Sequence, residues 1–140
     1  MYKKTIKYVD FNGIEKEEDY YFNLTRSEIS MMQLTTVGGF KEQIEKIVKS
    51  KDIKMIVETF KTIILTAYGV KSEDGLHFYK DDAIRKEFEA SAAYDELFME
   101  LSTNEKSAVE FINGIVPVLP EDHKKASDTP VIEASFNGNN

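Results

Sequence analysis

The 140-residue chain contains no cysteine and only two histidines, and these absences exclude several kinds of chemistry. Without thiols the chain can form no disulfide, no thiolate zinc site and no cysteine nucleophile. His77 and His123 are not at metal-ligand spacing from another histidine or a cysteine, as a zinc site would require. The sequence therefore predicts no metal and no cofactor.

Long apolar runs and an excess of positive charge are also missing. No stretch approaches the roughly 20 apolar residues of a membrane-spanning helix, and the first residues lack the apolar core of a signal peptide. The formal net charge is −7 at pH 7, whereas nucleic-acid binding requires a basic face. We therefore expect a cytosolic protein that binds neither membranes nor nucleic acid.

Paired carboxylates are present, but they do not indicate catalysis. They fall in two clusters, at positions 15–19 and 95–100. General acid–base chemistry needs a shielded cleft that shifts a pKa, and acid-rich solvated surfaces are far more common. No nucleophile stands beside an evident base, so we predict no catalytic residue and no enzyme.

The longest helical pattern runs from Asp52 to Gly69 and predicts the central helix of the domain. Its apolar residues recur at alternating steps of three and four, which places them on one buried face: Ile53, Ile56, Val57, Phe60, Ile63, Ile64, Ala67 and Tyr68. Asp52 is expected to cap the N-terminus, and Gly69 to end the helix in the left-handed conformation.

The first 22 residues predict a β-hairpin. Two strand-like segments, 3–10 and 14–22, flank an Asn12-Gly13 pair, which is favoured in tight turns because both residues tolerate positive φ. Ile14, Tyr20 and Phe22 are expected to share the inward face. Since an isolated hairpin is marginal in water, this one must pack on helices or pair with a partner.

Capping and helix-ending signals divide the rest of the domain into helices within residues 25–116. Thr25–Glu28 and Ser102–Glu105 match capping boxes. Segment 70–80 is expected to be a loop around Asp74-Gly75, and Asp81 or Asp82 to cap the next helix. Pro117 and Pro120 end the last helix. The predicted fold is α+β: an N-terminal β-hairpin packed on a mainly helical domain of about five helices, spanning residues 1–117.

Residues 118–140 are predicted to form a flexible C-terminal tail, because charged, small and proline residues dominate there. Val131, Ile132 and Phe136 form an apolar trio within it. An unstructured terminus and a peptide that docks on a partner both remain open for this segment.

Two positions in the domain are candidates for partner binding. Met31 is expected to be exposed, because Ile29 and Met32 already define the inward side of its helix; methionine lines adaptable surfaces as well as cores. Gly38-Gly39 interrupts the helical pattern nearby. A P-loop is excluded because its Lys-Ser/Thr is absent, so Gly38 and Gly39 are interpreted as a joint beside which a groove could open.

Several segments together resemble the tail assembly chaperones of long-tailed phages and prophages of Gram-positive bacteria. They are residues 21–28 (YFNLTRSE), Gly38-Gly39, 67–75 (AYGVKSEDG) and 93–101 (AYDELFMEL). The resemblance covers roughly residues 2–117 and is most specific at 67–79 and 93–101. No part of the tail from 118 onward is matched.

The resemblance implies a non-enzymatic helper in the host bacterial cytoplasm. Such chaperones hold the tape measure protein until tail tube subunits polymerise around it, and they are absent from the mature virion. The family often makes a longer product by a programmed frameshift, whose extension recruits the major tail tube protein. Lys124-Lys125 could mark such a frameshift, although lysine pairs also occur by chance.

A different class of function remains open as well. The chain could be a structural tail completion or connector subunit of the virion, in which the hairpin adds to a neighbour's sheet. A structural subunit stays in purified particles, whereas a chaperone does not. A small hydrolase or nuclease ranks last, because it would need a clustered site.

Overall fold

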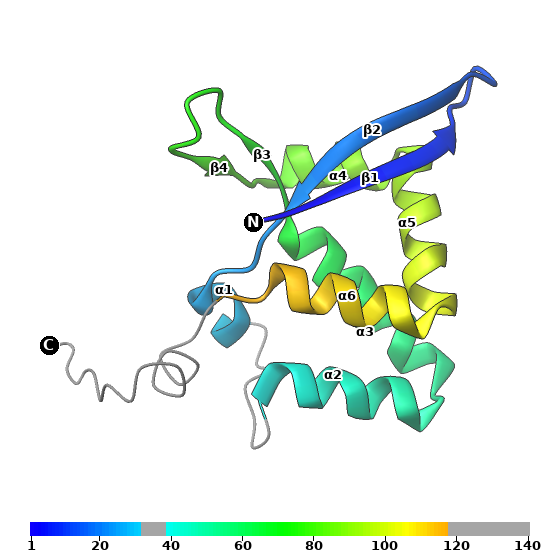
Figure 1. Cartoon of the computed structure of the whole chain (residues 1–140), viewed down its shortest axis with the longest axis vertical. Coiled ribbons are helices and arrows are strands. Elements are labelled where there is room, and N and C mark those ends of the chain that lie inside the picture. The colour runs from blue at the N-terminus through cyan, green and yellow to red at the C-terminus, as the bar shows by residue number, and fades with distance from the viewer. Residues whose placement is uncertain (32–38, 118–140) are drawn as a thin grey trace, which may run out of the picture.

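The structure is a computed structural model that describes residues 1–31 and 39–117, with only the backbone described at 39–41 (Figure 1). Within these residues it is an α+β fold with a four-stranded antiparallel sheet and six helices, which confirms the predicted class with one helix more than expected. In chain order the elements are β1 (Tyr2–Val9), β2 (Glu15–Phe22), α1 (Arg26–Met31), α2 (Gly39–Ser50), α3 (Ile53–Ala67), β3 (Tyr68–Lys71), β4 (Phe78–Tyr79), α4 (Asp82–Glu89), α5 (Ala92–Thr103) and α6 (Glu105–Ile115).

The predicted N-terminal hairpin is confirmed, and its turn is set by local hydrogen bonds. β1 pairs with β2 from Tyr2 opposite Phe22 to Val9 opposite Glu15. In the turn the Asp10 carboxylate accepts the backbone N–H groups of Asn12 and Ile14, each at 2.9 Å, and Gly13 has a φ of 80°. The bond from Ile14 is the main cause of the lowered pKa of Asp10.

One detail of the predicted hairpin is wrong. Ile14 does not share the inward face with Tyr20 and Phe22, because it lies in the turn before β2 begins and is 54% exposed. Phe22 is fully buried, and Tyr20 is half-buried against the core. The turn is therefore longer than the sequence pattern predicts.

A second, short hairpin occupies the segment predicted as a loop. β3 follows α3 directly and pairs with β2, with Phe22 opposite Tyr68, and β4 then pairs with β3. The Asp74-Gly75 turn itself is present, with Gly75 at a φ of 78°. Strands of four and two residues are too short to produce a clear alternating pattern, so only the pairing of β3 with β2 and of β4 with β3 reveals them.

Gly69 does not end the central helix as predicted. α3 ends at Ala67, and Tyr68 is already extended with a φ of −68° and a ψ of 142°. Gly69 lies in β3, where a Cβ atom would stand 2.7 Å from the Phe78 ring and 2.9 Å from the Tyr79 carbonyl oxygen. Glycine is needed here because β4 approaches closely, not because the backbone is left-handed.

The hydrophobic core lies between the sheet and the second half of α3. That half buries Phe60, Ile63, Ile64 and Ala67, while α5 packs against α3 and β1. Asp52 caps α3 as predicted, since its carboxylate accepts the Met55 N–H at 3.2 Å. The first half differs from the prediction of one continuous buried face, because Ile53, Met55 and Val57 are exposed.

The helix caps confirm one of the two predicted capping boxes. Thr25 and Glu28 accept each other's backbone N–H groups at 3.1 and 2.9 Å. The second box is wrong: Asn104 caps α6 by accepting the Ser107 N–H at 3.1 Å. Ser102 and Thr103 belong to the last turn of α5, where their hydroxyls donate to carbonyl oxygens of the preceding turn.

The close approach at Gly69 generates a prediction about stability. Gly69→Ala should lower the free energy of unfolding by about 1–3 kcal/mol, because the new methyl group overlaps the Phe78 ring and the β4 backbone. Urea denaturation followed by circular dichroism measures the change. Val70→Ala, at an exposed neighbour in the same strand, is the control and should cost less than about 0.5 kcal/mol. Equal effects of the two substitutions would contradict the interpretation.

Candidate functional site

An apolar groove lies between α2 and α6, which run side by side in opposite directions (Figure 1). We call it the α2–α6 groove, and it is lined by Ile44, Glu45 and Val48 from α2 and by Glu105, Ala108, Val109, Ile112 and Asn113 from α6. Its enclosed volume is only about 30 Å³. Small-molecule sites enclose roughly 300 Å³ or more, so the groove is shallow and suits apolar side chains of a partner rather than a small molecule.

The groove exists because α2 is attached to the domain by a narrow apolar face. Ile44 is the one fully buried residue among the described side chains of α2, and Ile47 and Val48 are only partly buried. On α6, Ala108 and Ile112 are buried and form the floor, whereas Val109 remains 39% exposed on the bank. The floor of the groove is thus the edge of the core.

Exposed apolar side chains continue along the chain from α2. At the start of α3, Ile53 is 71% exposed, and Met55 and Val57 are also exposed. Their helical spacing suggested core positions, but the core reaches only the second half of α3. Neither this surface nor the groove could be predicted from the sequence, because a helical period cannot distinguish a buried face from an uncovered one.

Met31 is 81% exposed at the end of α1, while Ile29 is buried on the inner side of the same helix. This arrangement agrees with the expected exposure of Met31, and its role in partner binding stays a prediction. Gly39 is the first residue of α2. Gly38, Lys124-Lys125 and the trio Val131, Ile132 and Phe136 lie outside the described residues, so the structure does not bring these candidates together.

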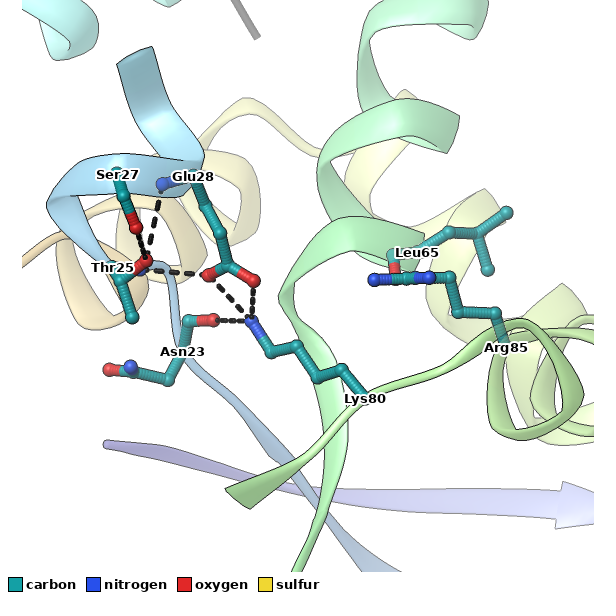
Figure 2. A network of polar contacts seen from close by, with 7 residues as sticks. All are labelled: Asn23, Thr25, Ser27, Glu28, Leu65, Lys80 and Arg85. Atoms are coloured by element: carbon teal, nitrogen blue, oxygen red, sulfur yellow. Dashed lines mark hydrogen bonds and ion pairs between the residues drawn. The ribbon is translucent and has the colours of Figure 1, made fainter. Parts of the chain in front are cut away.

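A buried ion pair fixes α1, and with it Met31, to the rest of the domain (Figure 2). The Lys80 ammonium donates to both carboxylate oxygens of Glu28, at 2.7 and 2.9 Å, and to the Asn23 carbonyl oxygen at 2.6 Å. Glu28 is also the capping residue of α1, bonded to the Thr25 N–H. One carboxylate therefore links the start of α1 to Lys80, which lies between β4 and α4.

Electrostatics of this contact follow from its partial burial. The Lys80 side chain is 10% exposed, and burial lowers the pKa of its ammonium, while Glu28 opposes the shift. Figure 2 shows Arg85 on the next helix, whose positive charge adds to the lowering. The Lys80 ammonium donates to Asn23 and to Glu28, and Glu28 also accepts from the Thr25 N–H, so the network positions α1.

The acidic clusters of the sequence likewise have structural roles or face solvent. Glu18 accepts hydrogen bonds from Tyr8 and Tyr20, and the bond from Tyr8 is the main cause of its lowered pKa. Glu100 pairs with Lys4 at 2.9 Å, joining α5 to β1. In the part of the chain that the structure describes, no group of His, Cys, Asp or Glu could hold a metal ion.

Comparison with known proteins decides the family. The sequence pattern of the family described as phage tail assembly chaperone matches residues 1–134, which is nearly the whole chain. The chain belongs to the phage tail assembly chaperones. No curated protein and no solved structure matches it.

The family match extends beyond the resemblance found in the sequence. It continues past residue 117 to residue 134, so it includes Val131 and Ile132, which the resemblance left out. A chaperone family points to a non-enzymatic protein whose partners are phage tail proteins. No helix in the described part of this chaperone is long and apolar enough to cross a membrane.

The Lys80–Glu28 contact generates a prediction about stability. Lys80→Met should lower the free energy of unfolding by about 1–3 kcal/mol, because it leaves the partly buried Glu28 carboxylate without its cation. Thermal and urea denaturation of the chaperone measure the loss. The control is Lys61→Met, since the Lys61–Glu89 ion pair is exposed and should contribute at most about 1 kcal/mol. A smaller loss for Lys80→Met than for the control would contradict this assignment.

Proposed function

We propose that this chaperone binds the tape measure protein of its phage and keeps it soluble until the tail tube forms around it. The observation that carries the proposal is the α2–α6 groove, an open apolar surface on a member of the tail assembly chaperone family. A tape measure chain without its tube is expected to expose apolar helix faces, which need cover to remain soluble.

The form of the groove supports helix binding. Two packed helices with apolar banks offer the mode in which an amphipathic helix lays its apolar face into a groove. Val48 and Val109 are the accessible apolar side chains on the two banks, and the buried Ile112 lies below them. A bound helix would therefore extend the existing core.

The proposal includes the setting of the protein. It acts in the cytoplasm of a Gram-positive host that carries a long-tailed phage or prophage, it is not an enzyme, and it is absent from the mature virion. A longer product made by frameshifting, with Lys124-Lys125 as the candidate site, would recruit the major tail tube protein. The nucleotide sequence at the end of this reading frame, and of the frame that follows it, checks whether such a longer product can be made.

The alternative, a structural tail completion or connector subunit, would use the free edge of the sheet. β1 is an edge strand and carries Lys3, Lys4 and Lys7; lysines on an edge disfavour pairing with a further strand. The groove is therefore the better-supported contact surface. Mass spectrometry of purified virions separates the two functions, because a structural subunit would be present in every particle.

Co-expression with the tape measure protein tests the proposed function. The chaperone should recover soluble tape measure protein in a pull-down, and Val109→Gln should weaken that complex about tenfold, because about 1.4 kcal/mol of apolar burial is lost. Met99→Gln on α5 is the control: Met99 is also exposed, at 50% against 39% for Val109, but it does not line the groove. Circular dichroism establishes that both variants are folded.

Two outcomes would count against this proposal. If the chaperone recovers no tape measure protein in any form, the binding function is wrong. If a chain ending at residue 117 loses the complex while Val109→Gln keeps it, the binding surface lies in residues 118–140, around Val131, Ile132 and Phe136, and not in the groove.

Met31 supplies a separate prediction. Met31→Glu should leave the free energy of unfolding within about 0.5 kcal/mol of the parent, since the side chain is exposed. It should weaken the tape measure complex if Met31 lies at the contact, because an apolar anchor is replaced by a charge. Isothermal titration calorimetry measures the affinity, and an unchanged affinity would remove Met31 from the binding surface.

A further inference from the structure

Glutamates on both banks of the α2–α6 groove have no cationic partner among the described side chains. Glu45 on α2 and Glu105 on α6 line the groove and are exposed. Neither forms an ion pair within residues 1–31 and 42–117, whereas several other acidic residues there do. No described lysine or arginine side chain lines the groove. An apolar floor is thus bordered by negative charge on two sides.

We propose that the α2–α6 groove receives an amphipathic helix of another protein whose apolar stripe is bordered on both sides by lysine or arginine. The inference rests on the proposed function and deepens it, because it states which kind of tape measure segment binds. An apolar stripe covers Val48, Val109 and Ile112, and the flanking cations meet Glu45 and Glu105. A binding helix with acidic borders would place like charges together and is rejected.

The dimensions of the groove set the length of the contact. α6 has 11 residues, which corresponds to about 16 Å at 1.5 Å per residue. A helix lying along it contributes about three turns, with apolar residues at positions i, i+3, i+4 and i+7. The binding segment is therefore a short stretch of a longer helix, and several copies of the chaperone can occupy one tape measure chain.

Charge also argues against the two other possible occupants. A second copy of this chain carries the same net charge of −7, so its approach is opposed by repulsion. Residues 118–140 contain four acidic residues against two lysines, which does not complement an acidic border. A separate basic helix matches the groove in both apolar character and sign of charge.

Two synthetic peptides test the inference directly. Both form a helix of about 20 residues with the same leucine stripe, bordered by lysine in one peptide and by glutamate in the other. Fluorescence anisotropy measures their binding to the full chain. The lysine peptide should bind at least about tenfold more tightly in about 50 mM NaCl, and the difference should shrink in about 500 mM NaCl as salt screens the exposed charges.

A matched pair of double variants assigns the effect to the groove. The double variant Glu45→Gln with Glu105→Gln should bind the lysine peptide about five- to tenfold more weakly, since each exposed ion pair contributes a few-fold to the affinity. Glu15→Gln with Glu73→Gln makes the same change in net charge on the two hairpins, away from α2 and α6 (Figure 1). This control should leave the affinity for the lysine peptide within about twofold of that of the unsubstituted chain.

Four results would overturn the inference. The first is equal affinity for the two peptides, and the second is an equal loss of lysine-peptide affinity in the two double variants. The third is lysine-peptide binding that becomes more than tenfold tighter when the chain ends at residue 117. The fourth is dimerisation of the chain that Val109→Gln abolishes. The third result identifies residues 118–140 as the occupant, and the fourth identifies a second copy. If the tape measure protein still co-purifies in any of these cases, the proposed function stands while this inference fails.

Discussion

Burial of the Phe22 ring is the contact on which the rest of the fold depends. Phe22 is fully buried, and its centroid lies 5.8 Å from the ring of Tyr68, 5.9 Å from Phe88 and 5.2 Å from Phe111. These three rings come from β3, α4 and α6. A single side chain of β2 therefore holds the long hairpin, the short hairpin and two helices together, through aromatic contacts that add to the burial of apolar area.

The position of this core explains why a partner surface is left over. The aromatic cluster and the second half of α3 lie toward the sheet, and α2 lies at the opposite end of the molecule (Figure 1). α2 therefore contributes Ile44 to the core but leaves Val48 only partly buried beside the exposed Val109. The helix binding that we propose for the α2–α6 groove would therefore leave the aromatic cluster that stabilises the domain intact.

Local chemistry was enough to predict several features from the sequence. The hairpin turn at Asn12-Gly13, the capping box of Thr25 with Glu28 and the cap at Asp52 depend on groups within five residues of one another, so their geometry follows from residue type and spacing. The α+β class and the exposure of Met31 also follow from apolar periodicity. The resemblance to tail assembly chaperones rested on segment 21–28, which contains this capping box, and on Gly38-Gly39, 67–75 and 93–101.

Tertiary structure alone decided the features that depend on distant neighbours. β3 exists as a strand because β2 offers it hydrogen-bond partners, and β4 because β3 does. Gly69 is required by the approach of Phe78 rather than by a helix end. The exposed start of α3 and the α2–α6 groove have the apolar pattern of a core, but no element within residues 1–31 and 39–117 packs over them. Periodicity records which face of a helix is apolar, and only the packing of the whole chain determines whether that face is covered.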